Sequence, residues 1–109
     1  MFDKSQLMRG TLEGSILKII SLEVTYGYGI MERLREYGFE DIKEGTIYPL
    51  LIRLEKKGLI SSEFKESPLG PSRKYYTITA EGIETLKLFE EYWWKISKTV
   101  NNVLSGGEV

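Results

Sequence analysis

The last quarter of the chain carries an apolar repeat that a helix can bury only against another helix. From Ala80 the sequence runs AEGIETLKLFEEYWWKISKTVNNVL, a stretch that Thr79 can start as N-cap. Its apolar side chains recur at alternating steps of three and four, which is a heptad stripe typical of paired helices. The sequence therefore predicts a helix from Ala80 to about Leu104 that forms a dimer with a second copy, and Leu88 and Tyr92 beside the stripe are expected to face the chain's own body. The predicted dimerisation residues are Leu86, Phe89, Trp93, Ile96, Val100 and Val103.

Three shorter helices are predicted before this long one. Helical spacing of apolar residues indicates helices over residues 5–22, 28–37 and 45–57, with Gly38 ending the second and Gly58 the third. The third helix has a stripe of core positions at Ile47, Leu50, Leu51 and Leu54.

Glycine and proline inside these helices add constraints. Gly10 and Gly14 each cost about 1 kcal/mol relative to alanine, so we expect another helix to approach the backbone closely there. Pro49 is tolerated only near a helix start, which places it in the first turn of the third helix, with Thr46 or a neighbour as N-cap.

Two short extended segments follow the third helix. Residues 59–64 (LISSEF) and 74–78 (KYYTI) are typical of strands, and the turn-rich, basic connector KESPLGPSR lies between them. Three helices, a β-hairpin and a final helix make a mainly α protein of the winged helix-turn-helix type. We expect residues 1–79 to form the DNA-binding domain and residues 80–109 the dimerisation helix, in one compact unit.

Composition excludes most catalytic chemistry. The 109 residues contain neither histidine nor cysteine, which removes imidazole bases, thiol nucleophiles and the usual zinc ligands. A carboxylate-dependent enzyme stays an alternative, but the acidic residues lie among lysines and no Gly-rich phosphate loop accompanies them. We therefore expect no enzymatic activity, no metal and no cofactor.

Charge and hydropathy bear on partners and location. The net charge is −1, so any surface for nucleic acid must be local. No apolar run approaches the roughly 20 residues that span a bilayer, and the first residues lack the layout of a signal peptide. We expect a cytoplasmic protein without a membrane partner.

Three stretches carry a resemblance to a known family. They are TYGYGI at 25–30, KEGTIYPLLIRLEKKGLISSEF at 43–64 and GPSRKYYTITAEG at 70–82. In this order and spacing they resemble the PadR-like transcriptional regulators, especially the short members with a single C-terminal dimerisation helix. The resemblance implies a homodimeric repressor that binds double-stranded DNA until a small aromatic or drug-like effector, or another signal, releases it.

The outward side of the third helix supplies the predicted DNA contacts. It offers hydroxyls, a ring and cations, and the resemblance places Thr46, Tyr48 and Pro49 nearest the bases. Alternatively, Tyr48 packs beneath the wing and Arg53 pairs with a carboxylate. The residues and the resemblance together imply DNA contacts at Tyr28, Lys43, Gly45, Thr46, Tyr48, Pro49, Arg53, Lys56, Lys65, Gly70, Ser72, Arg73 and Lys74.

The hairpin contributes positive charge around a Pro-Leu-Gly-Pro tip. Lys65, Arg73 and Lys74 suit phosphate groups, although Glu63 and Glu66 weaken the field and leave a merely solvated hairpin as the alternative. Tyr28 fits either a phosphate contact or ordinary packing.

The final helix carries a candidate ligand platform. Trp93 lies on the heptad stripe, where a planar molecule could stack between rings of two subunits, as the resemblance to multidrug-sensing members also implies. Plain dimer core is the alternative. The residues predicted around such a ligand are Met8, Leu12, Ser15, Phe89, Trp93 and Ile96.

Two functional hypotheses follow. The first is a ligand-responsive repressor whose two recognition helices fit half-sites about 34 Å apart on a nearly palindromic operator. The second is a winged-helix module that binds protein instead of DNA, which the near-neutral charge permits.

Overall fold

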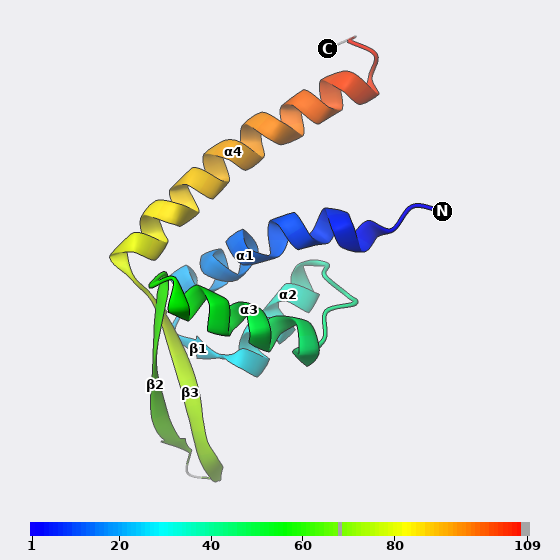
Figure 1. Ribbon diagram of the computed structural model, residues 1–109. Coiled ribbons are helices and arrows are strands. Elements are labelled where there is room, and N and C mark those ends of the chain that lie inside the picture. The colour runs from blue at the N-terminus through cyan, green and yellow to red at the C-terminus, as the bar shows by residue number, and fades with distance from the viewer. Residues whose placement is uncertain (68, 108–109) are drawn as a thin grey trace.

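The computed structural model describes residues 1–67 and 69–107 and confirms the predicted winged helix-turn-helix, with one additional short strand. Figure 1 shows α1, α2 and α3 gathered in one body, the β2–β3 hairpin projecting from it as the wing, and α4 leaving in another direction above α1. The molecule is elongated, with extents of 57 × 33 × 21 Å. The elements are α1 (Lys4–Leu22), β1 (Thr25–Tyr26), α2 (Gly27–Tyr37), α3 (Glu44–Lys56), β2 (Ile60–Ser67), β3 (Gly70–Ile78) and α4 (Ala80–Leu104).

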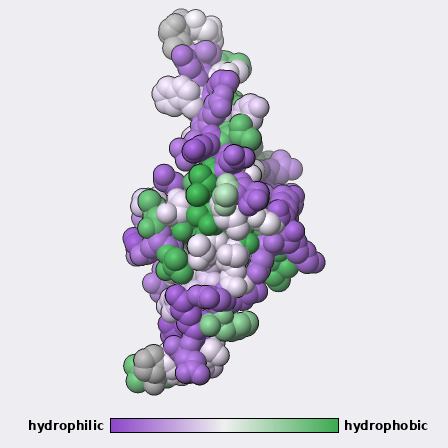
Figure 2. Space-filling model, turned by 90° about the vertical axis from the view of Figure 1, so that its left-hand side faces the viewer, coloured by the Kyte–Doolittle hydropathy of each residue, from purple (hydrophilic) through white to green (hydrophobic). Residues whose placement is uncertain are grey.

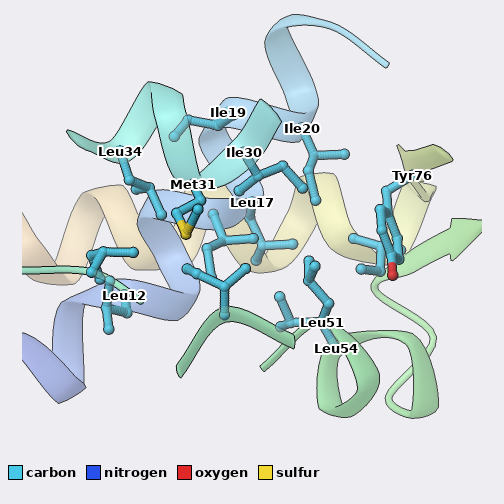
Figure 3. Packing of buried hydrophobic residues seen from close by; sticks show 14 of the residues in the cluster. Leu12, Leu17, Ile19, Ile20, Ile30, Met31, Leu34, Leu51, Leu54 and Tyr76 are labelled. Carbon is cyan, nitrogen blue, oxygen red and sulfur yellow. The ribbon is translucent and has the colours of Figure 1, made fainter. Parts of the chain in front are cut away.

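The core lies between the first three helices. Figure 3 shows their apolar side chains converging, with the ring of Tyr76 from β3 at one edge. Each such side chain contributes about 1.5–3 kcal/mol when it is fully buried. The side chains with the least exposure are Ile16, Leu17, Ile30, Leu34, Ile42, Ile47, Leu51, Leu54 and Ile60.

Local sequence signals set the helix ends. The Asp3 side chain accepts a hydrogen bond from the Ser5 amide at 3.0 Å and starts α1. Gly38, with φ of 124°, ends α2. Thr79 accepts from the Gly82 amide at 3.0 Å, which confirms it as the N-cap of α4.

The helix α3 begins within one residue of the predicted start, but the predicted N-cap Thr46 and the predicted place of Pro49 were wrong. The carbonyl of Lys43 already accepts from the amides of Thr46 and Ile47, at 3.0 and 3.1 Å, so the helix begins at Glu44 and Thr46 is not its N-cap. Pro49 consequently lies in the second turn instead of the first. Because proline has no N–H, the carbonyl of Gly45 lacks its helical hydrogen-bond donor.

The wing is longer than predicted, and its sheet has a third strand. Most of the connector expected at 65–73 is strand, with a register that runs from Ile60 opposite Ile78 to Lys65 opposite Arg73. The residues of the tip include Pro68, which lies outside the described residues. Strand β1 pairs with β3 only at residues 75 and 76, so Pro71 occupies a part of β3 whose other edge has no β1 partner. Proline is compatible with such an open edge.

The apolar stripe of α4 divides between two environments. Leu86 is only 5% exposed and belongs to the chain's own core, and Phe89 is half-buried against it, so these two do not lie on a free dimer face. Trp93 and the stripe residues after it are exposed. Leu88 and Tyr92 are also exposed, which contradicts their expected contact with the body; the Leu86 side of α4 makes that contact instead.

Figure 2 shows the molecule from the side. Hydrophilic residues cover most of the arm formed by α4 and most of the wing, while hydrophobic residues gather mainly on the body between the arm and the wing. Among the described residues, no helix is long and apolar enough to span a membrane.

The contact between α1 and α4 depends on a missing side chain. A Cβ at Gly14 would collide with the ring of Phe89, whereas a Cβ at Gly10 would meet nothing within 4 Å. The predicted close approach is therefore confirmed at Gly14, where it comes from the chain's own α4, and is absent at Gly10.

We predict opposite effects of alanine at these two glycines. Gly14→Ala should lower the free energy of unfolding by about 1–3 kcal/mol because the new methyl group overpacks the contact with Phe89. Gly10→Ala is the matched control and should raise it by up to about 1 kcal/mol, since alanine favours a helix over glycine. Urea unfolding followed by circular dichroism measures both, and equal effects would contradict the proposed role of the contact.

Candidate nucleic-acid interface

The exposed face of α3 is the centre of the candidate interface. Ile47, Leu51 and Leu54 are buried, so helical geometry turns the opposite positions to solvent. Tyr48 is 41% exposed and Ile52 is 53% exposed. The residues on this outward face are Gly45, Tyr48, Pro49, Ile52 and Lys56.

Tyr48 joins this face to the start of α2. Its ring lies against Gly27, where an added Cβ would lie 2.6 Å from Cε1 of Tyr48, so glycine makes room for the ring. The ring borders a hollow of about 460 Å³ between the start of α2, α3 and the wing. Tyr48 thus packs against Gly27 at the start of α2 and still presents an exposed edge on the outward face of α3. The hollow is lined by Tyr26, Gly27, Tyr28, Tyr48, Arg73, Lys74 and Tyr76.

Two tyrosines of the hollow have a raised pKa. Hydrogen bonding of the Tyr28 hydroxyl to the Glu32 carboxylate raises the pKa of Tyr28, and burial raises the pKa of Tyr76. A tyrosine hydroxyl has one proton to donate, and that of Tyr28 is engaged by Glu32. Tyr28 is exposed at the rim of the hollow, and a phosphate contact there would require its hydroxyl to leave Glu32.

An acidic residue fixes the wing to the end of α3. The Glu55 carboxylate accepts a hydrogen bond from the Ser62 hydroxyl at 2.6 Å and pairs with Lys74 at 3.1 Å. The hydrogen bond from Ser62, assisted by Lys74, lowers the pKa of Glu55 and keeps it ionised. Lys74 is thus occupied by Glu55, while Lys65 and Arg73 lie on the other face of the hairpin.

A stack of rings and cations braces that other face. The Arg73 guanidinium lies 4.6 Å from the centre of the Tyr26 ring, and Lys65 Nζ lies 5.2 Å from the centre of the Tyr75 ring. The rings of Tyr26 and Tyr75 are 5.6 Å apart. Cation–π contacts of this kind hold charges in place without neutralising them. Lys65 Nζ also lies 3.9 Å from the Glu63 carboxylate, which weakens its field, whereas Arg73 has no carboxylate within 4 Å in the described part of the chain. Sequence reasoning missed Tyr26 and Tyr75; the alternation in KYYTI was a signal that could have placed Tyr75 beside Arg73.

Two cations of α3 point away from the exposed face. Arg53 Nε lies 3.2 Å and Lys57 Nζ 3.7 Å from the carboxylate of Glu13 on α1. Arg53 therefore pairs with a carboxylate, which is the alternative that the sequence left open for it. Lys56 has no carboxylate within 4 Å among the residues that the structure describes, so it is the cation that α3 offers to a ligand.

The remaining predicted contacts lie at the margins. Lys43 precedes α3 and is exposed, and Thr46 and Pro49 border a hollow shared with the start of α1. On the wing, Gly70 and Ser72 are exposed residues of β3.

The predicted ligand residues are not all together. Met8, Trp93 and Ile96 line one apolar groove between α1 and α4, and Ser15 and Phe89 border a neighbouring hollow that also includes Trp93. Leu12 is 4% exposed and belongs to the core, so it contributes no free surface to that groove.

With this geometry in hand, comparison with known proteins identifies the family. Residues 16–88 match the model of the transcriptional regulator PadR-like family, a match that covers more than half of the chain. The chain belongs to the PadR-like family. This result confirms the predicted resemblance, and it makes the chain a transcriptional regulator and not an enzyme.

Solved PadR-like structures have the same fold. A PadR-like transcriptional regulator from Bacillus cereus is 50% identical with a TM-score of 0.82, and the similarity covers 91% of this chain and 96% of that one. A PadR family transcriptional regulator from Eggerthella lenta is 36% identical with a TM-score of 0.83, over 91% and 86% of the two chains.

A protein of Lysinibacillus sphaericus described as uncharacterized is 33% identical over 107 residues, which is 96% of this chain and 98% of that protein.

Proposed function

We propose that this PadR-like regulator is a sequence-specific DNA-binding repressor in which α3 enters the major groove and the wing contacts the flanking backbone. The observation that carries the proposal is the exposed face of α3 beside a braced, cationic wing. A helix of this width fits the major groove, and a projecting hairpin reaches the adjacent phosphates.

The distribution of charge supports DNA as the ligand. The chain as a whole carries a net charge of −1, yet Lys56, Lys65 and Arg73 lie around α3 and the wing. The Tyr26–Tyr75 brace holds Arg73 and Lys65 over rings, and Arg73 is not within 4 Å of a carboxylate in the described part of the chain. Phosphate binding needs this kind of local, exposed positive charge.

The exposed part of the α4 stripe supports a homodimer. Trp93, Ile96 and Val100 form an apolar groove with Leu7 and Met8 of α1, and Val103 extends the stripe. A second copy of α4 offers the matching heptad stripe. In this proposal residues 1–79 form the DNA-binding domain, residues 80–109 form the dimerisation helix, and the two α3 helices reach half-sites about 34 Å apart on a nearly palindromic operator.

Trp93 is also the proposed platform for an effector. Two hollows meet at its ring, one with Met8 and Ile96 and one with Ser15 and Phe89. A planar aromatic molecule bound there would lie at the α1–α4 junction, which sets the separation of the two DNA-binding domains in a dimer. Effector binding would thereby release the operator.

We predict that the face of α3 and the wing contribute differently to DNA binding. Tyr48→Ala should weaken binding to the promoter DNA upstream of the chain's own gene more than binding to a scrambled duplex. Arg73→Ala should weaken both and reduce the slope of log affinity against log salt by about 1, because one phosphate contact is lost. Gel-shift titrations at two salt concentrations measure these effects. A DNA affinity that depends neither on salt concentration nor on the sequence of the duplex would favour the protein-interaction module instead.

We predict that the two neighbouring tryptophans of α4 differ in their effect on assembly. Trp93→Glu should convert the dimer to monomers because it places a charge in an apolar interface. Trp94→Glu is the matched control, since Trp94 is exposed on another side of the helix and lies off the heptad stripe, and it should stay dimeric. Sedimentation equilibrium measures both. A dimeric Trp93→Glu variant would remove the stripe from the interface.

A further inference from the structure

Ile52 occupies the middle of the outward face of α3. It is 53% exposed, and it lies one helical turn after Tyr48 and one turn before Lys56. Ile52 lies outside the core stripe of this helix, whose members Ile47, Leu51 and Leu54 are buried. If the outward face binds DNA, the side chain of Ile52 would gain free energy from contact with an apolar group of the DNA.

The groups on α3 that could bind base edges by hydrogen bonding are scarce. The helix, EGTIYPLLIRLEK, contains no asparagine or glutamine, and its arginine, Arg53, pairs with Glu13 on α1. Guanine is most often recognised by arginine or lysine, and adenine by asparagine or glutamine. Lys56, one turn beyond Ile52, is therefore the residue of this face that could select guanine, while the middle of the face carries no such side chain.

We infer that Ile52 is a specificity-determining residue that contacts the C5-methyl groups of thymines in the major groove, with the Pro49 and Tyr48 rings beside it. This inference rests on the proposed DNA-binding function. The thymine methyl is the apolar group that the major groove of unmodified DNA offers. The DNA half-site consequently carries thymine opposite the centre of α3.

The flanking charges favour DNA over a protein as the occupant of this surface. The apolar strip is one side chain wide at Ile52, and the cationic side chain of Lys56 follows one turn later on the same face. Arg73 on the wing borders the same hollow as Tyr48 of α3, and Lys65 lies opposite Arg73 on the neighbouring strand. A narrow apolar strip bordered by cations matches the methyl groups on the floor of a groove whose walls are phosphates.

The test uses DNA selected by the full-length protein from random-sequence duplexes, followed by replacement of single thymines with deoxyuridine, which lacks the methyl group. At the thymine opposite Ile52, we expect a three- to fourfold loss of affinity, the effect of one methyl-sized apolar contact. Deoxyuridine at thymines outside the half-sites should have no effect.

Variants of Ile52 then link the methyl group to this side chain. Ile52→Ala should weaken binding to the thymine duplex several-fold and should abolish the penalty of deoxyuridine, while Ile52→Val should retain part of it. Because Ile52 is exposed, these changes leave the core intact. Ile83→Ala, at a similarly exposed isoleucine on α4, is the control and should keep the full penalty.

Two outcomes would overturn the inference in different ways. Selection of a defined sequence whose binding is unaffected by deoxyuridine, or a penalty that persists in Ile52→Ala, would refute the role of Ile52 and leave sequence-specific DNA binding in place. Failure to enrich any sequence would refute the proposed DNA-binding function together with the inference.

Discussion

The buried side of α3 is the constraint on which the remaining structure depends. Ile47, Leu51 and Leu54 pack against α1 and α2, and this contact decides which side of the helix faces solvent. The same contact places Tyr48 over Gly27 and brings Glu55 within reach of Ser62 and Lys74 on the wing. The orientation of the exposed face of α3 is thus a consequence of core packing and needs no separate set of interactions.

A second contact, between α1 and α4, determines where the arm points. Phe89 lies against Gly14, and Leu86 enters the core from the first part of α4. Beyond this contact α4 leaves the body (Figure 1), and the stripe from Trp93 onward stays exposed. One helix therefore belongs to the core at its beginning and offers an apolar surface at its end. A change in the α1–α4 angle would move the proposed DNA-binding surface relative to that arm.

Periodicity and capping predicted the helices and the winged fold because these depend on neighbouring residues. A capping residue at Thr79 indicates a helix start, and a glycine inside a helical segment at Gly14 indicates a close approach by another element. Both signals can be seen in the local sequence. The strand extension through Pro71 was missed because an open strand edge is a property of the sheet, and β1 was missed because two residues show no period. The pairing of Arg53 with Glu13 joins distant parts of the sequence, so spacing along α3 could not settle it. For the same reason the heptad stripe could not show that Leu86 turns inward.

We propose that two copies of this fold place two α3 helices on one side of an operator. Hydroxyl-radical footprinting of the selected operator measures this arrangement directly. We expect two protected regions related by a two-fold axis, with centres about 34 Å, or one helical turn, apart on the same side of the duplex. A single protected region, or two regions on opposite sides of the duplex, would contradict it.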